Sequence, residues 1–318
     1  MKIFLRKEWW KLLAPFFLLA WAWADFRVPK AEERIAAAGS LVGLDERERR
    51  AFTAGEYFQE KRVPRGSDWL ATHKEEGQTY SQYLSSGANR PGRGGRDTLY
   101  LLPLGEFPEE RSPSLNSLRE HMSLYYAPMK VKILPVISSD EVSVAKRGNR
   151  QQGTEQWHTG AVLSWLKKRL PDDCYGLLAV TMTDLYPGEG WNFVFGQAAY
   201  RDRVGIFSFA RFEPVSEAQE ERQKAILRRA CKVLTHEMGH MFGIKHCIYY
   251  ECNMNGANSL REMDSTPMNL CPVCLRKLQR AIGFTPSSRY QGLERFFREL
   301  NFVEEAAWLQ KRRVWVDQ

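Results

Sequence analysis

The pattern of hydrophobic and polar positions changes near residue 97. Residues 25–90 are polar and rich in charge, with runs such as DERERR at 45–50, and they favour helices with little apolar surface. A loop dense in glycine, arginine and proline follows at 85–97, which is typical of a boundary between structural units. The sequence therefore predicts a helical N-terminal extension at residues 25–96, followed by a larger folded unit.

Beyond this boundary, strand-like and helix-like segments alternate. The near-continuous apolar run at 175–182 indicates a strand that is covered on both faces. The short turn between the last two predicted strands favours an antiparallel hairpin. Strands are predicted at 98–104, 130–137, 175–182, 192–199 and 204–210, and helices at 114–126, 157–170, 216–241 and beyond 285.

The predicted helix 216–241 has two apolar faces, with Ser216 as a suitable N-cap. One face carries Ile226, Ala230 and Val233 together with Glu237 and His240, and the other carries Leu227, Cys231, Leu234 and Met238. Because both faces are apolar, we expect this helix to be buried on two sides. The polar side chains near its end are then expected inside or beside the core.

Length and composition are those of a folded globular protein. With 318 residues, of which 43% are apolar and 26% charged, the chain can bury a full core. The net charge is +8, and the basic residues are spread over several stretches, such as RPGRGGR at 90–96. Since no basic stretch is interleaved with aromatic residues, we expect no nucleic-acid partner. We expect the protein to be a monomer.

The first 24 residues have a pattern of their own. Four basic residues precede an apolar run from Leu12 to Ala24, which is shorter than the roughly 20 residues of a transmembrane helix. This layout, with Ala22-Trp23-Ala24 as a cleavage site, is typical of a secretory signal peptide. An uncleaved membrane tether, an amphipathic surface helix and a buried helix are the alternatives. Residues 1–24 therefore predict a periplasmic, secreted or membrane-tethered protein, with a cytoplasmic location as the alternative.

The stretch THEMGHMFGIKHCIYYECNM at 235–254 contains half of the six histidines of the chain. His236 and His240 are four residues apart, so they project from one face of a helix and can reach one tetrahedral zinc. Gly243 permits a positive φ that turns the chain out of the helix, and His246 then becomes a third ligand. Glu237 lies between the first two ligands, within reach of a metal-bound water. This spacing predicts a catalytic zinc site.

The chemistry expected at this site is hydrolysis of a peptide or related amide. Three protein ligands leave the fourth position of the zinc open to water, whose pKa falls to near neutrality. Glu237 would take the proton of that water and pass it to the leaving amine. A core helix that happens to hold histidines is the alternative, but five positions match the motif. We therefore predict a zinc-dependent peptidase, with a catalytically weak zinc-binding interaction protein as the second hypothesis.

Four cysteines follow the third histidine at the spacing of a zinc site. Cys247 and Cys252 precede the pair Cys271-Pro-Val-Cys274 by about twenty residues. Four thiolates leave no room for substrate, so this zinc would be structural and would fix the segment after His246. Two disulfides, which export would favour, and a redox CxxC pair are the alternatives. We expect two zinc ions per chain, one catalytic and one structural.

Together, these motifs resemble one protein family. HEMGHMFGIKH is the extended zinc motif of the metzincins, and its continuation HCIYYECNM…CPVC is similar to that of the archaemetzincin family of metalloproteases. The segments TMTDLYPGEGWNFVFGQA at 181–198 and RVGIFSFARF at 203–212 also resemble the family. The resemblance extends over residues 97–285.

This resemblance implies a fold, a substrate class and one further site residue. The fold would be α+β, a metzincin-like zinc protease domain at 97–285 with a twisted mixed sheet, an active-site helix and a cysteine-rich, zinc-stabilised C-terminal subdomain. A helical segment at 286–318 would follow. Met254 would be the methionine of the Met-turn beneath the catalytic zinc. Strand 192–199 would be the edge along which an extended peptide or protein substrate docks.

Overall fold

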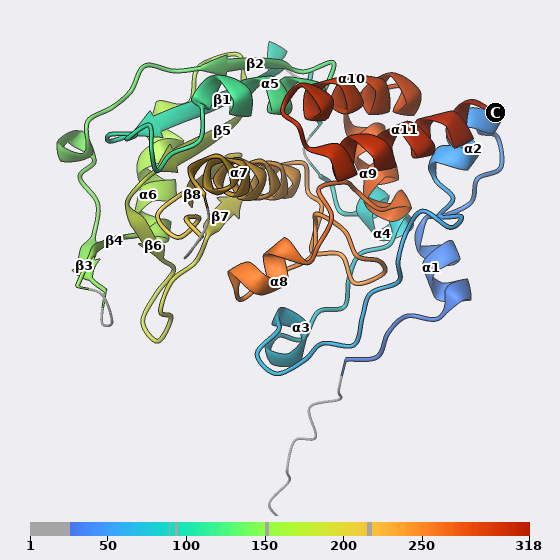
Figure 1. Ribbon diagram of the computed structural model, residues 1–318, viewed down its shortest axis with the longest axis horizontal. Helices are drawn as coiled ribbons and strands as arrows, with labels where there is room; N and C mark the ends of the chain where they lie inside the picture. The colour runs from blue at the N-terminus through green and yellow to red at the C-terminus, as the bar shows by residue number, and fades with distance from the viewer. Residues whose placement is uncertain (1–25, 89, 93–94, 150–152, 215–217) are drawn as a thin grey trace, which may run out of the picture.

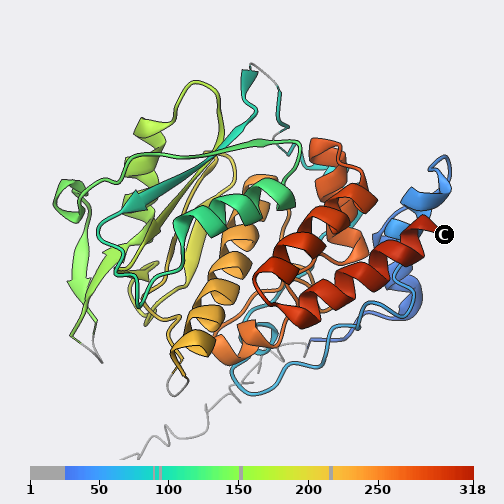
Figure 2. The same ribbon diagram turned by 45° about the horizontal axis from the view of Figure 1, so that its top comes forward.

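The computed structural model describes residues 26–88, 90–92, 95–149, 153–214 and 218–318. A mixed sheet with helices on both faces lies at one side, and helices from both ends of the chain gather at the other (Figure 1, Figure 2). The central sheet has the spatial order β2 (Lys130–Ile133), β1 (Thr98–Leu104), β5 (Cys174–Thr181), β8 (Val204–Ser208) and β7 (Gly196–Ala199). A smaller sheet has the order β3 (Lys146–Gly148), β4 (Glu155–His158) and β6 (Asp184–Tyr186).

Helices make up most of the remaining regular structure in these residues. They are α1 (Ala31–Ala37), α2 (Glu46–Ala51), α3 (Trp69–Thr72), α4 (Tyr80–Ser85), α5 (Leu115–Tyr125), α6 (Thr159–Leu166), α7 (Gln219–Met241), α8 (Leu260–Asp264), α9 (Pro272–Ile282), α10 (Pro286–Glu299) and α11 (Val303–Asp317), with 3₁₀ turns η2 (Ser139–Glu141) and η3 (Lys167–Arg169). In the central sheet, β2, β1, β5 and β8 run parallel, and the edge strand β7 runs antiparallel to β8. The predicted hairpin and the mixed α+β architecture are confirmed.

The central strands divide their side chains between two cores. In β1, Leu99 and Leu101 belong to the core beneath α7 and α5, whereas Tyr100 and Leu102 belong to the core beneath α6. This alternation follows from the two-residue period of a strand. Every residue of β5 is buried, because a central parallel strand is covered on both faces. The apolar run predicted at 175–182 is therefore this strand, displaced by one residue.

Helix α7 crosses one face of the sheet and carries the histidine motif. It ends at Met241, as predicted, and begins at Gln219 with Ala218 in the N-cap position. The predicted N-cap, Ser216, lies outside the described residues. Both predicted apolar faces pack into the core, with Ile226, Ala230, Cys231, Leu234 and Met238 buried and Leu227 partly buried.

Three predicted elements differ from the observed ones by about four residues at one end, because a proline or contacts from distant segments decide where they begin and end. The helix predicted at 157–170 begins only at Thr159, since His158 pairs with β6 and its Nδ1 caps the helix by accepting from the Ala161 amide at 3.2 Å. Its last part is the 3₁₀ turn η3. The strand predicted at 130–137 ends at Ile133 because Pro135 has no N–H to donate.

The strand predicted at 192–199 begins only at Gly196. The carbonyl of Asn192 accepts from Gln156 Nε2 at 2.9 Å and from Arg147 Nη2 at 3.2 Å, so the backbone there is bonded to side chains of the smaller sheet. The amide of Val194 donates to the carbonyl of Leu185 in β6. Residues 192–194 therefore connect the two sheets, and bonding to β8 begins at Phe195, whose carbonyl accepts from the Ser208 amide at 2.9 Å.

The N-terminal extension packs on the rest of the chain. It contains the short helices α1 to α4 separated by irregular chain, so the predicted helical character is only partly right. Ala37, Phe52 and Tyr83 belong to the same core as α7. Buried Arg312 of α11 donates through Nη2 to the carbonyls of residues 50, 51 and 53, which joins the two ends of the chain.

The domain boundaries at 96/97 and 285/286 stay predictions. The signal-peptide interpretation of residues 1–24 lies outside the described residues and also stays a prediction. Among the described residues, no helix has both the length and the apolar character needed to cross a bilayer.

Candidate active site and metal-binding groups

A cleft of about 600 Å³ runs beside the C-terminal half of α7. One wall is formed by residues 191–198, which include the start of β7, and another by residues 253 and 255–258 with Met263 of α8. Trp69 of the N-terminal extension also lines the cleft. Glu237 and the three predicted histidine ligands open into this cleft, which is concave and mostly apolar, as small-molecule and peptide sites usually are.

The three histidines lie together, and one nitrogen of each ring is held by the protein. Nδ1 of His236 contacts the carbonyl of Asn253 at 2.8 Å, and Nδ1 of His240 contacts the carbonyl of Ile244 at 2.7 Å. Nδ1 of His246 contacts Oε1 of Glu75 at 2.7 Å. These contacts leave Nε2 of each ring as the nitrogen available to a metal, and they fix the orientation of the rings.

The spacing of the histidine nitrogens fits a tetrahedral zinc. Nε2 of His236 and Nε2 of His240 are 3.0 Å apart, and the ligand atoms of all three histidines lie within 4.8 Å of one another. Zinc–nitrogen bonds of about 2.0–2.1 Å at tetrahedral angles place two ligand atoms about 3.3 Å apart. Burial, with the neighbouring imidazoles, lowers the pKa of His240 to about 3 and that of His236 well below its usual value. Both rings are therefore neutral, which is the form that binds metal.

Gly243 has the role predicted for it. Its φ is +81°, in the left-handed region that a glycine adopts without strain, and its amide donates to the carbonyl of His240 at 2.8 Å. A Cβ at this position would lie 2.7 Å from Cβ of Ala88. The turn of the chain toward His246 thus depends on glycine both for its conformation and for the space beside it.

The Glu237 carboxylate lies between α7 and the edge strand. A Cβ built on Gly196, the first residue of β7, would meet Glu237 Oε1 at 2.7 Å. The absence of a side chain at Gly196 therefore gives this carboxylate its place beside the histidines. Burial raises the pKa of Glu237 to about 8, and a dication held by the neighbouring imidazoles would lower it, because opposite charge favours the ionised form.

Met254 lies beneath the histidine-bearing helix. It is fully buried, and its sulfur would be 2.7 Å from a Cβ built on Gly239, the residue before His240. The backbone of Met254 is held by one hydrogen bond, in which the amide of Cys247 donates to the carbonyl of Met254 at 2.8 Å. The Met-turn role that the family resemblance implies for Met254 stays a prediction.

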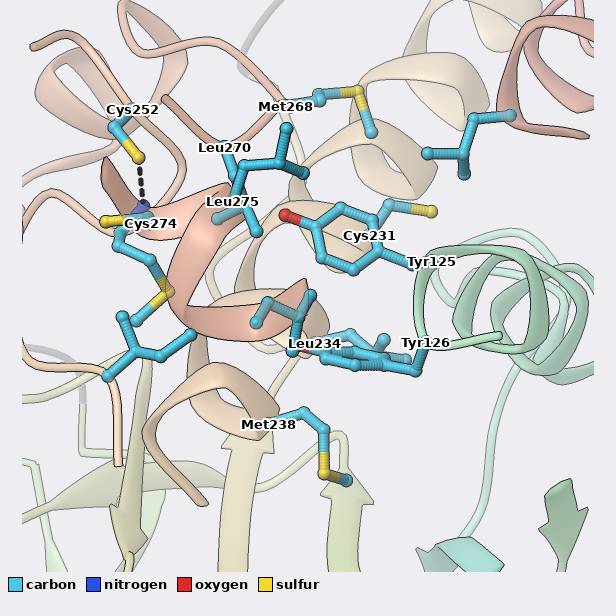
Figure 3. Packing of buried hydrophobic residues seen from close by; sticks show 14 of the residues in the cluster. Tyr125, Tyr126, Cys231, Leu234, Met238, Cys252, Met268, Leu270, Cys274 and Leu275 are labelled. Carbon is cyan, nitrogen blue, oxygen red and sulfur yellow. Dashed lines mark hydrogen bonds between the residues drawn. The ribbon is translucent and has the colours of Figure 1, made fainter. Parts of the chain in front are cut away.

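The four predicted cysteine ligands form a second group. Cys247, Cys252, Cys271 and Cys274 are buried and unpaired, and their sulfurs lie within 4.8 Å of one another. Cys252 and Cys274 are at one end of the buried cluster in Figure 3. The Cys252 sulfur accepts from the amide of Cys271 at 3.3 Å, and the sulfurs of Cys247 and Cys271 lie 3.5 Å apart. A closed set of four sulfurs, with no disulfide among them, fits a structural zinc.

Two residues that contact the histidine site could not be predicted from the sequence. Glu75 accepts from His246 across 171 positions of sequence, and Gly196 provides the space for the Glu237 carboxylate. Burial alone would raise the pKa of Glu75, but the hydrogen bonds from His246 and Trp69 lower it below its usual value. Since both residues approach from separate elements, no local spacing in the sequence could have identified them.

An open group of three histidines with an adjacent carboxylate in a cleft is typical of zinc hydrolases. The model of Peptidase family M54 matches residues 146–280. Archaemetzincin-2 of Mus musculus is 35% identical over 278 residues, covering 79% of this chain and 77% of that protein. Archaemetzincin-2 of Homo sapiens is 35% identical, with 72% of each chain covered. Archaemetzincin-1 of Homo sapiens is 33% identical and is covered over 51% of its length.

Among solved structures, the archaemetzincin of Methanopyrus kandleri is 32% identical, with 60% of this chain and 98% of that one covered and a TM-score of 0.47. The identity and coverage of the archaemetzincin-2 relatives decide the family. The chain belongs to the archaemetzincin family. It is a zinc metallopeptidase, and its substrates are peptides or proteins.

Proposed function

We propose that the chain hydrolyses peptide bonds at the cleft beside α7, with Glu237 as the general base and acid and with His236, His240 and His246 as the ligands of the catalytic zinc. The observation that supports this most is the arrangement of the three imidazoles. Each has one nitrogen bonded to an oxygen of the protein and the other free for the metal, and Glu237 lies next to them in the same cleft.

In this mechanism the chain contributes proton transfer and substrate orientation. Zinc held by the histidines would polarise the scissile carbonyl and acidify the attacking water. Glu237 takes the proton of that water and returns it to the leaving amine. Its burial restricts the carboxylate to a small space between Gly196 and α7, so the base is already positioned before substrate arrives.

The edge strand β7 is the proposed docking element for the substrate backbone. It pairs with β8 along one edge only, and residues 195–198 line the cleft along the other. An extended peptide can add to such an edge through main-chain hydrogen bonds, which makes recognition largely independent of its side chains. The docking segment is shorter than predicted, since residues 192–194 bond to the smaller sheet instead.

The four-cysteine group is proposed to hold a second, structural zinc. Its ligands bracket residues 248–251 and 253–270, so the metal would fix the loop that carries Met254 and the carbonyl of Asn253. That carbonyl contacts Nδ1 of His236. The structural zinc would thus support the orientation of a catalytic ligand without contacting substrate.

Comparison of the wild type with Glu237→Gln tests the proposed function. Both proteins are incubated with a mixture of unmodified and N-terminally blocked peptides, and the products are identified by mass spectrometry. Loss of a general base reduces the rate by about 10²–10⁴-fold, while the zinc content should stay at the wild-type value. Near-wild-type hydrolysis by Glu237→Gln would refute the assignment of Glu237. A wild type that binds peptides and zinc without any turnover would favour the interaction-protein hypothesis.

A further inference from the structure

The segment at residues 67–78, here called the N-terminal strap, crosses the cleft region although it lies outside the part of the chain matched by the family model. At its start, the amide of Trp69 donates to both carboxylate oxygens of Glu262 in α8, at 2.9 and 3.0 Å. The α3 turn accordingly lies beside α8 in Figure 1. The strap is therefore fastened to the wall of the cleft.

The other end of the strap is fastened to the turn that leads to His246. Nε2 of Gln78 donates to the carbonyl of Gly243 at 3.2 Å, and Oε1 of Gln78 accepts from the amide of Lys245 at 3.3 Å. The Gln78 carbonyl in turn accepts from the buried ammonium of Lys277 in α9. With both ends held, the chain between them has a defined position over the third histidine.

Glu75 lies in this fixed stretch and contacts His246 directly. Its Oε1 accepts from His246 Nδ1 at 2.7 Å and from Trp69 Nε1 at 2.9 Å. The other two histidines are oriented by backbone carbonyls close to them in the fold, whereas His246 is oriented by a charged side chain. A carboxylate on Nδ1 fixes the tautomer with Nε2 free and makes that nitrogen a stronger donor to a metal.

We propose that Glu75 is a positioning residue for the third zinc ligand, and that Trp69 holds its carboxylate in place. The N-terminal strap is then a component of the catalytic centre. This inference rests on the proposed function, because it requires His246 to be a ligand of the catalytic zinc. It predicts that removal of Glu75 weakens zinc binding at the histidine group by about 10–100-fold, the effect of losing such a supporting carboxylate.

Zinc affinity, measured by competition with a chromogenic chelator, tests the proposal without reference to activity. The variants are Glu75→Ala, Glu75→Gln and, as matched control, Glu76→Gln, which alters the adjacent exposed carboxylate. A thiol reagent in the same assay reports on the cysteine group, so that its zinc is distinguished from zinc at the histidine group. We expect the largest loss for Glu75→Ala and a smaller one for Glu75→Gln, which keeps the shape and loses the charge. Glu76→Gln should retain wild-type affinity.

Two further variants separate the possible outcomes. Trp69→Phe keeps an aromatic ring beside His73 and removes the N–H bonded to Glu75 together with part of the indole, so it should weaken zinc binding to a smaller extent even if Glu75→Ala folds poorly. If His246→Ala loses the catalytic zinc while Glu75→Ala and Trp69→Phe keep wild-type affinity, this inference is wrong and the proposed function stands. If His246→Ala itself binds zinc normally, the proposed ligand set fails, and the inference fails with it.

Discussion

Gly196→Ala is the substitution that most directly probes the position of the proposed base. The backbone at Gly196 has no positive φ, so alanine is compatible with its conformation. The new Cβ, however, would lie 2.9 Å from both Cγ and Cδ of Glu237 and 2.7 Å from its Oε1. The substitution therefore adds one methyl group directly against the carboxylate and leaves the histidines untouched.

The size of the effect follows from these distances. Carbon atoms in contact are normally about 3.5–4.0 Å apart, so the Glu237 side chain must retreat by about 0.5–1 Å. Misplacement of a reacting group by about 1 Å can reduce the rate by about 10²-fold. Crowding in a packed site destabilises by about 1–3 kcal/mol, and replacement of glycine in a strand recovers about 0.5–1 kcal/mol of that.

The assay compares kcat/KM on a cleaved peptide, zinc per chain and thermal stability for wild type and variant. We expect kcat/KM to fall about 10²-fold with zinc content unchanged. Gly188→Ala is the matched control, because its added Cβ would meet nothing within 4 Å. A Gly196→Ala enzyme with wild-type kcat/KM and normal zinc would show that the carboxylate position at this strand does not matter for turnover, and the proposed role of Glu237 would have to be abandoned.

Two further predictions concern stability and metal content. Cys271→Ser should lower the folding yield and remove about one zinc equivalent per chain; if the cysteines form disulfides instead, the zinc content will not change. Lys61→Met should destabilise the fold by about 3 kcal/mol in urea denaturation, because the buried Glu251 carboxylate would lose the ammonium 3.0 Å from its Oε2 and keep the Arg62 amide at 3.1 Å and the more distant Arg62 guanidinium at 4.0 Å. A loss below about 1 kcal/mol would mean that this ion pair contributes as little as an exposed one.

Elements defined by a local pattern could be predicted from the sequence, and elements defined by a distant partner could not. The bounds of β1 were predicted correctly, because Thr98 is followed by an uninterrupted apolar run of buried residues. The end of α7 was also correct, since Gly243 follows it closely. The strand character of Trp157 was missed, because it results from pairing with β6, and the late start of β7 results from side chains of the smaller sheet.

The same distinction applies to the site. The histidines and Glu237 have fixed spacings on α7 and the turn after it, and the cysteines have fixed spacings between that turn and the start of α9, so their assembly into two groups could be predicted from those spacings. The sequence around Glu75 has no such spacing to the histidines. It reaches His246 only because Gln78 and Trp69 fasten the strap at both ends, and these contacts bridge more than 160 positions of sequence. A residue that supports a metal ligand from another secondary-structure element can be identified only in a structure.

The loop that carries the cysteines is connected directly to the histidine group. His246 and Cys247 are adjacent in sequence, and the loop returns at Asn253, whose carbonyl contacts His236 and whose side chain donates to Thr235 Oγ1 at 2.7 Å. Two of the three histidines are therefore attached to one loop, and the cysteines fix both ends of it. Since a change in the position of this loop would move His236 and His246 relative to His240, we expect the zinc proposed for the four-cysteine group to maintain the spacing that the histidine nitrogens would need to share one ion.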